Sequence, residues 1–263
     1  MLAGIRDILI ITNPKDYNHF VELLKDGSQW GISIKYAVQA KPSGIAEAFI
    51  IAEKFIDNEP SCLILGDNIL YGAGNIKILQ EKAKSRDGAS VFCLSVKDPQ
   101  RYGVVSFNDA GRATSIEEKP KNPKSNFAVI GLYFYDNNVV DIAKSIKPSV
   151  RGELEITDVN QVYLQRSELT VNQLGRGAAW FDAGTHESLV EAAYFMNIIE
   201  RQQGLKIGCC EEIAFLMGYI DQEQLERVIS QIKNTSYGQY LQTVLRSKVS
   251  EKAIRGIICG SVR

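Results

Sequence analysis

The first hundred residues alternate short apolar segments with segments of helical spacing, and this alternation constrains the fold more than any other feature. Residues 8–12, 32–38 and 63–65 have the pattern of strands. Residues 16–25 have the apolar spacing of a helix, and Ser43 is expected to cap a second helix. A β-α-β-α-β order predicts an α/β protein with parallel strands and helices on the faces of the sheet.

The alternation of strand and helix patterns continues to about residue 100, and a different pattern follows. Residues 104–107 and 113–117 flank the turn Asp109-Ala110-Gly111 and indicate a β-hairpin. The other predicted elements are a helix over 75–85, a strand over 89–96, a long strand over 127–135 covered on both faces, helices over 139–146 and 156–165, and a strand over 169–174. From residue 188 the chain is predicted to be mostly helical, with Leu189, Ala192, Met196 and Ile199 on one stripe. We therefore expect an α/β core, residues 1–187, and a helical region, residues 188–263.

Charge and composition exclude several classes of protein. The chain has 30 basic and 31 acidic residues, and this balance argues against bulk electrostatic binding to nucleic acid or to a membrane. No run approaches the roughly 18 apolar residues of a transmembrane helix, and the first residues lack the pattern of a signal peptide. We expect a cytoplasmic protein. Its five cysteines contain no C-x-x-C pair, so neither a disulfide framework nor a zinc site is indicated.

Two aspartates are candidate metal ligands. Asp67 follows the strand over 63–65 and the small residue Gly66, at the edge of a parallel sheet where ligands bind. Asp182, in the segment WFDAGTH, has the same setting, with Thr185 expected to cap the next helix. Mg²⁺ typically takes one or two protein carboxylates together with water and substrate phosphate. The alternative is that Asp67 only caps a following helix.

Three further segments carry polar groups suited to a nucleotide sugar. In Glu117-Glu118-Lys119-Pro120 a carboxylate can accept sugar hydroxyls and a lysine can hold a phosphate, although a solvated turn gives the same pattern. Tyr102-Gly103 and Arg151-Gly152 carry a similar ambiguity, and residues 39–44 could read a base edge. There is no Ser-His-Asp arrangement, H-E-x-x-H or G-x-G-x-x-G, so acyl transfer and dinucleotide redox chemistry lose support.

Six ordered motifs together resemble the bacterial glucose-1-phosphate thymidylyltransferases: QAKPSGIAEAF, LGDNILYG, RYGVVSF, EEKPKNPKSNFAVIGLYFYD, RGELEITD and WFDAGTHESL. The resemblance implies a Rossmann-like nucleotide-diphospho-sugar transferase fold with a mixed, mostly parallel sheet and a helical C-terminal extension. It implies transfer of a thymidylyl group from dTTP to glucose 1-phosphate, giving dTDP-glucose and pyrophosphate for dTDP-rhamnose and surface polysaccharide. It also implies Mg²⁺ as cofactor and a homo-oligomer, a tetramer in the family.

The resemblance assigns roles to individual residues. Asp67 and Asp182 match the residues that bind magnesium in the family. Together with Lys119 they also match its catalytic residues. The substrate-binding matches are Gln39 and Gly44 for thymine, Gly103, Glu118 and Val129 for the sugar, Lys119 and Arg151 for the sugar phosphate, and Pro42 and Tyr102 beside them.

The same resemblance implies that the chain is N-terminally truncated. The family begins with a strand and a glycine-rich loop of the type G-G-x-G-T-R-L, whereas Met1 to Asp7 match a point just before its second strand. We therefore expect two unpaired inner strand edges and little turnover. One alternative is a non-catalytic subunit that binds a dTDP-sugar. Another is a glycosyltransferase of related fold, against which the Glu117–Pro120 and Trp180–His186 segments argue.

Overall fold

Strand β8, Phe127–Tyr135, is the centre of the main sheet in the computed structural model, which describes residues 1–72 and 74–246. It runs antiparallel to three strands: β3 (Ser61–Ile64), β5 (Ala89–Ser95) and β6 (Gly103–Phe107). The hairpin partner of β6 is β7 (Ala113–Glu118), and β9 (Leu169–Gln173) lies parallel to β5. The predicted hairpin is therefore confirmed.

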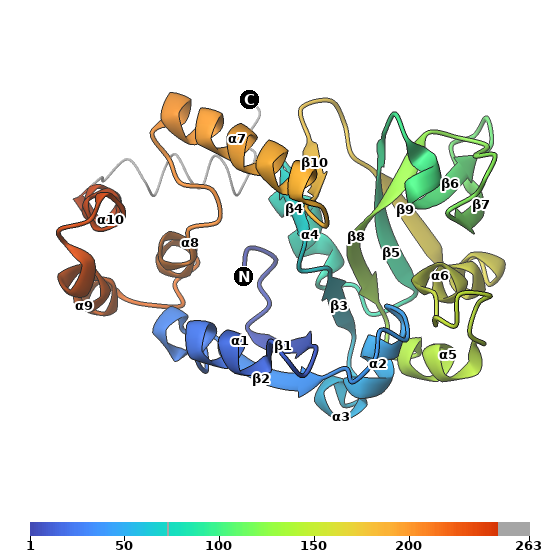
Figure 1. Ribbon diagram of the computed structural model, residues 1–263, viewed down its shortest axis with the longest axis horizontal. Helices are drawn as coiled ribbons and strands as arrows, with labels where there is room; N and C mark the ends of the chain where they lie inside the picture. The colour runs from blue at the N-terminus through green and yellow to red at the C-terminus, as the bar shows by residue number, and fades with distance from the viewer. Residues whose placement is uncertain (73, 247–263) are drawn as a thin grey trace.

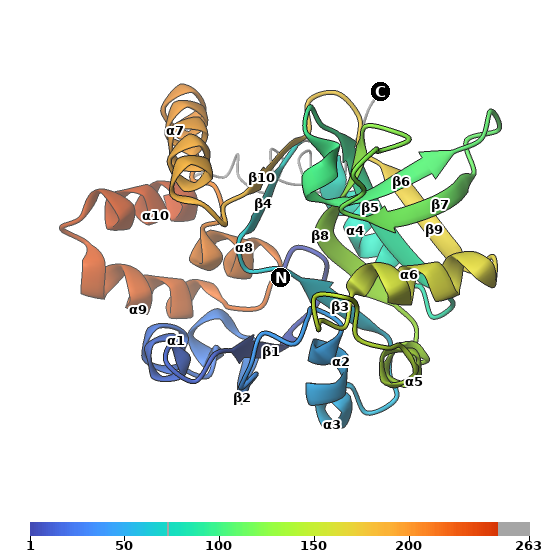
Figure 2. The same cartoon turned by 45° about the vertical axis from the view of Figure 1, so that its right-hand side comes forward.

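The side chains of β8 are buried alternately in two apolar layers, as predicted for a strand covered on both faces. Val129, Tyr133 and Tyr135 pack with helices α2 (Glu47–Ile51), α5 (Val139–Ser145) and α6 (Ile156–Gln165). Ile130, Leu132 and Phe134 pack on the other side, where helix α4 (Asn75–Lys82) lies. Figures 1 and 2 show these helices on either side of the sheet.

Two small sheets lie beside the main one. Strands β1 (Asp7–Thr12) and β2 (Ser33–Val38) are parallel, and β4 (Asn68–Tyr71) is antiparallel to β10 (Ala179–Asp182). Within the described residues β1 pairs only with β2, and β3 pairs only with β8. Each of β1 and β3 therefore has one edge without a strand neighbour, as expected from the sequence.

The remaining elements are mostly helical. They are α1 (Tyr17–Leu24), α3 (Glu53–Ile56), α7 (His186–Gln203), α8 (Cys210–Leu216), α9 (Gln222–Ile232), α10 (Ser236–Arg246), and the short 3₁₀ turns η1 (Ser28–Trp30) and η2 (Pro99–Arg101). Helices α8 to α10 share a separate apolar cluster that includes Leu225 and Leu241, and Trp30 packs against it. The division of the chain at residue 187 stays a prediction. No helix in the described part of the chain could cross a membrane.

The α/β class and the mixed sheet are confirmed, but three details of the sequence prediction were wrong. Among the described strand pairs, only β1–β2 and β5–β9 are parallel, because β8 runs against each of its neighbours. Ser43 caps no helix, because α2 has Ala46 at its N-cap and the Ser43 carbonyl accepts from Leu154 N instead. Leu189 does not join Ala192 in the interior, since it is 52% exposed.

Candidate active site

The strand pair β4–β10 brings the two predicted metal ligands together. Asp67 lies in the turn between β3 and β4, and Asp182 is the last residue of β10, paired with Asn68. Ala183 N donates to the Asp67 carbonyl at 2.8 Å. A Cβ atom on Gly184 would lie 3.2 Å from Asp182 Oδ1 and 3.3 Å from Asp67 Oδ2, so these two oxygens are at most about 6.5 Å apart. Because residues 68–71 form a strand, the helix-cap interpretation of Asp67 is wrong.

Asn68 holds Asp67 and the strand that carries Asp182 in place, a role that was not predicted from the sequence. Its Nδ2 donates to Asp67 Oδ1 at 2.8 Å, while its Oδ1 accepts from Gly131 N at 2.8 Å and from Trp180 Nε1 at 2.7 Å. The Asn68 side chain of β4 therefore connects this strand to β8 and β10. A Cβ on Gly131 would come within 2.7 Å of the Asn68 side chain, so only glycine allows this approach.

The aspartate pair fits a magnesium ion. Carboxylate oxygens are the donors that Mg²⁺ prefers, and two of them leave room in its octahedron for water and substrate phosphate. Among the described residues no group of three or more His, Cys, Asp and Glu side chains is arranged to hold a metal. A site of this kind needs oxygen atoms from a bound phosphate, so metal and nucleotide binding are expected to be coupled.

A second cluster surrounds Gly103 at the start of β6. Gly103 is paired with Glu118 of β7, and Thr157 Oγ1 of α6 donates to Glu118 Oε2 at 2.5 Å. A Cβ on Gly103 would lie 3.1 Å from Thr157 Oγ1, 3.5 Å from Glu118 Oε2 and 3.9 Å from Val129 Cβ. The structure thus brings three predicted sugar-binding residues together. Thr157 was missed, although it lies in the RGELEITD motif that was used only for Arg151.

Arg151 and Lys119, the two cations predicted to hold the sugar phosphate, differ in whether they form ion pairs within the protein. Arg151 donates to Glu155 at 2.8 Å and lies 3.5 Å from Glu118, and the hydrogen bond to Glu155 raises the pKa of the guanidinium. Lys119 is exposed, and within the described part of the chain its ammonium forms no ion pair. Its backbone is held at φ 41°, a region that non-glycine residues rarely adopt, by a hydrogen bond from its N–H to Tyr102 O. Of these two cations, Lys119 is therefore the one that forms no ion pair within the described residues.

Tyr102 connects the two clusters. Its ring lies 4.9 Å from that of Trp180 in an edge-to-face arrangement, and Trp180 in turn donates to Asn68. Burial raises the pKa of Tyr102, and the negative charge of Asp182 raises it further. The sugar cluster and the aspartate pair are therefore neighbours in one site.

The predicted base-binding loop, residues 39–44, contacts Leu154, which lies between Arg151 and Thr157 in the sequence. Gln39 Nε2 donates to Gly44 O at 3.1 Å and to Glu47 Oε2 at 2.6 Å. Gly44 has φ 106°, and a Cβ there would lie 2.3 Å from Leu154 O, so this loop requires glycine. Pro42 is exposed in the same loop. The loop thus lies beside the segment that carries Arg151 and Thr157.

Comparison with known proteins places this site in a family. Residues 1–198 match the family model described as nucleotidyl transferase, and the chain belongs to that family. A glucose-1-phosphate thymidylyltransferase of Neisseria meningitidis is 55% identical over 246 residues, covering 94% of this chain and 85% of the relative. That of Xanthomonas campestris is 51% identical, covering 94% and 83%. The resemblance inferred from the motifs is confirmed.

Solved structures agree with the fold. The crystal structure of a Bacillus anthracis protein assigned as a glucose-1-phosphate thymidylyltransferase, in complex with sucrose, matches with a TM-score of 0.69 and 41% identity over 79% of this chain and 80% of that one. A UDP-glucose pyrophosphorylase complexed with UDP-glucose matches with a TM-score of 0.62 over 75% of this chain and 83% of that one; at 24% identity it supports the fold alone.

Proposed function

We propose that this chain carries the site for transfer of a thymidylyl group from dTTP to glucose 1-phosphate, which yields dTDP-glucose and pyrophosphate. The observation that carries the proposal is the convergence of the Asp67 and Asp182 carboxylates at Gly184, next to the cluster of Gly103, Glu118 and Thr157. The aspartate pair suits the diphosphate, and the cluster around Gly103 suits the sugar. The names of relatives about half identical over nearly the whole chain point to the same pair of substrates.

The reaction needs positioning and charge neutralisation more than proton transfer. A phosphate oxygen of glucose 1-phosphate attacks the α-phosphorus of dTTP in line, and pyrophosphate leaves. Mg²⁺ held by Asp67 and Asp182 would neutralise charge on the phosphates. Glu118 and Thr157 orient the sugar, and Lys119 and Arg151 hold its phosphate, while the Gln39–Gly44 loop faces the thymine. No histidine is required.

The proposal includes a homo-oligomer, and helix α7 offers a surface for it. Leu189, Val190 and Tyr194 are 52%, 68% and 69% exposed on this helix. Apolar residues grouped on one exposed helix are typical of a contact between subunits. Burial of this surface against a second copy would remove it from water.

Turnover measurements test the proposal. With dTTP, glucose 1-phosphate and Mg²⁺ we expect slow formation of dTDP-glucose and pyrophosphate in equal amounts, separated by ion-pair chromatography. Asp67→Asn and Asp182→Asn should each lower kcat on the order of 100- to 1000-fold, the usual effect of removing a charge-stabilising group. Asp109→Asn, in the exposed hairpin turn, is the matched control. Equal activity in all three variants would contradict the assignment.

The same protein distinguishes an enzyme from a binding subunit. Isothermal titration with dTDP-glucose, and separately with dTTP plus Mg²⁺, reports each affinity without turnover. Binding of dTDP-glucose with no product from dTTP would identify the chain as a sugar-nucleotide-binding subunit. Binding of neither ligand would contradict both functions.

A further inference from the structure

The orientation of the Gln39 side-chain amide is fixed by two acceptors. Its Nε2 lies 3.1 Å from the Gly44 carbonyl oxygen and 2.6 Å from Glu47 Oε2. Carbonyl and carboxylate oxygens accept hydrogen bonds and donate none, so the amide atom that contacts both must belong to the NH₂ group. The other end of the amide, Oε1, makes no hydrogen bond within residues 1–72 and 74–246 and is the end left for a ligand.

Glu47 is anchored by the protein core. It is the first residue of helix α2, and the preceding Ala46 is fully buried, with its N–H donating to the Leu154 carbonyl at 3.1 Å. Phe49, two residues further along α2, is 3% exposed and packs in the main core. The Gln39 amide is therefore oriented by a carboxylate whose backbone is held in place on both sides.

The second polar group of the loop is the Gly44 N–H. The backbone bonds around it run from Leu154 N to Ser43 O and from Ala46 N to Leu154 O, so within the described residues this N–H donates to no protein acceptor. Because Gln39 Nε2 contacts the Gly44 carbonyl, Gln39 Oε1 and the Gly44 N–H are an acceptor and a donor on neighbouring groups. Thymine presents the complementary pair, an N3–H donor and an O4 acceptor, whereas cytosine presents an N3 acceptor and an N4–H₂ donor.

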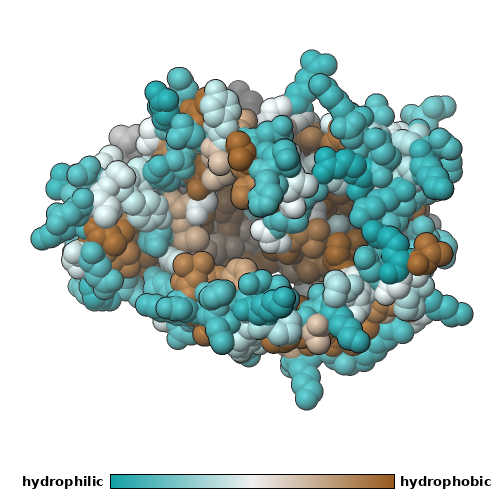
Figure 3. Space-filling view, viewed as in Figure 1, coloured by the Kyte–Doolittle hydropathy of each residue, from teal (hydrophilic) through white to brown (hydrophobic). Residues whose placement is uncertain are grey.

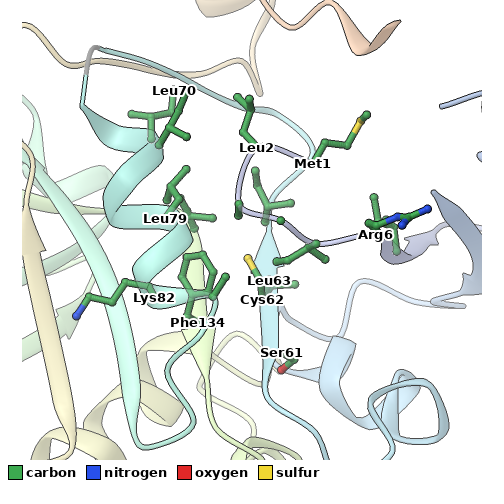
Figure 4. Close-up of a pocket in the computed structure, with 18 of the residues that line it drawn as sticks. Met1, Leu2, Arg6, Ser61, Cys62, Leu63, Leu70, Leu79, Lys82 and Phe134 are labelled. Atoms are coloured by element: carbon green, nitrogen blue, oxygen red, sulfur yellow. The ribbon is translucent and has the colours of Figure 1, made fainter. Parts of the chain in front are cut away.

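These contacts are separate from the large apolar cavity of the molecule, whose volume is about 1720 Å³. In the space-filling view the centre of the molecule is hollowed and coloured as hydrophobic, inside a hydrophilic rim (Figure 3). The close-up shows Leu79 of α4 and Phe134 of β8 in its lining (Figure 4). Gln39, Gly44 and Glu47 are not among the residues that line this cavity. The orientation of the Gln39 amide therefore does not involve the cavity.

We propose that Glu47 is a positioning residue that sets the base specificity of the site, by holding the Gln39 amide with its oxygen toward the base. The inference rests on the proposed function, in which the Gln39–Gly44 loop faces the thymine. In this orientation a cytosine would place its N3 lone pair against Gln39 Oε1 and its N4–H₂ group against the Gly44 N–H. A site built for one hydrogen-bond pattern rejects a base with the opposite pattern, because polar groups are left unpaired.

Isothermal titration with two ligands tests this role. They are dTDP-glucose and 5-methyl-dCDP-glucose, whose bases differ only at N3 and at the substituent on C4. The parent should bind dTDP-glucose at least about 100-fold more tightly, because two hydrogen-bonding positions are mismatched in the other ligand. Glu47→Lys replaces the acceptor by a donor, which reverses the preferred orientation of the Gln39 amide and should reduce this affinity ratio at least about ten-fold. The Gly44 N–H still favours thymine in this variant.

Three further variants separate specificity from stability. Glu47→Gln keeps an acceptor oxygen and should retain the affinity ratio of the parent within about two-fold. Glu47→Met removes the acceptor without adding a charge and should lower the ratio at least about five-fold. Glu22→Lys makes the same charge change as Glu47→Lys on the exposed side of α1 and should leave the ratio unchanged. A general effect of charge or of loop stability cancels in the ratio, because it acts on both ligands.

The outcomes distinguish this inference from the proposed function. Equal losses of affinity for the two ligands in Glu47→Lys and Glu47→Met would show that Glu47 only stabilises the loop, and would overturn the inference. Equal binding of the two ligands by the parent would overturn it as well, while leaving the proposed function in place. A parent that binds neither ligand would overturn the proposed function and this inference with it.

Discussion

The substitution Asn68→Ala tests how the aspartate pair is held. It removes the acceptor of the Gly131 and Trp180 N–H groups and the donor to Asp67. Gly131 is buried, so its orphaned N–H costs about 1 to 3 kcal/mol. The indole of Trp180 is only partly buried and can reach water, so its lost bond costs about 0.5 to 1.5 kcal/mol. We expect the free energy of unfolding to fall by about 1.5 to 4.5 kcal/mol, the sum of these two costs.

Urea unfolding followed by circular dichroism measures this change. Asn137→Ala is the matched control, because the Asn137 side chain makes a single exposed hydrogen bond to Asn58, and its loss should cost less than about 0.5 kcal/mol. A loss below about 1 kcal/mol for Asn68→Ala, or equal losses in the two variants, would refute the reasoning.

The same variant separates positioning from stability. Partners that orient a metal ligand typically contribute about 10- to 100-fold in metal affinity. We expect the Mg²⁺ concentration for half-maximal turnover to rise by about ten-fold in Asn68→Ala at a temperature where the variant is folded. An unchanged Mg²⁺ requirement would show that Asn68 only stabilises the fold.

Three other predictions follow from the site and the helical region. Gly103→Ala places a methyl group 3.1 Å from Thr157 Oγ1 and should raise the KM for glucose 1-phosphate about ten-fold while leaving that for dTTP unchanged in steady-state kinetics. Burial raises the pKa of Glu212 above its ordinary value of 4.5, so its contribution to stability is present below pH 4.5 and is lost as the pH rises through the raised value. Urea midpoints of the parent should therefore fall relative to Glu212→Gln over that range, and parallel curves would contradict this. Tyr194→Glu should lower the mass measured by light scattering, whereas Glu223→Gln on α9 should not.

Local sequence patterns predicted most strands and helices, because their apolar spacing survives in the fold. Strand 127–135 and helix 156–165 have the predicted bounds, and Thr185 caps α7 as expected. Strand β4 was missed because four residues, NILY, are too few to show a period. Its position depends on pairing with β10, more than a hundred residues away, which no local pattern encodes.

In the candidate site, too, residues with a local sequence pattern were predicted and residues defined by distant partners were missed. Asp67 and Asp182 were found because a carboxylate at the end of an apolar strand is unusual on its own. Asn68 and Thr157 were missed because their roles come only from partners distant in sequence, Gly131 and Trp180 for one and Glu118 for the other. The pairing of Arg151 with Glu155 likewise depends on the start of α6. Thr157 lies two residues after Glu155 in the RGELEITD motif, and this hydroxyl among motif carboxylates is the signal that could have been followed.

Titration of the chain with dTDP-glucose tests most directly the central claim that one site holds both the diphosphate and the sugar. We predict saturable binding of one dTDP-glucose per chain that strengthens with Mg²⁺, loses this Mg²⁺ dependence in Asp182→Asn, and weakens about ten-fold or more in Glu118→Gln. Asp109→Asn should bind like the parent. An affinity for dTDP-glucose that does not depend on Mg²⁺ and is unchanged in Asp182→Asn and Glu118→Gln would contradict the account.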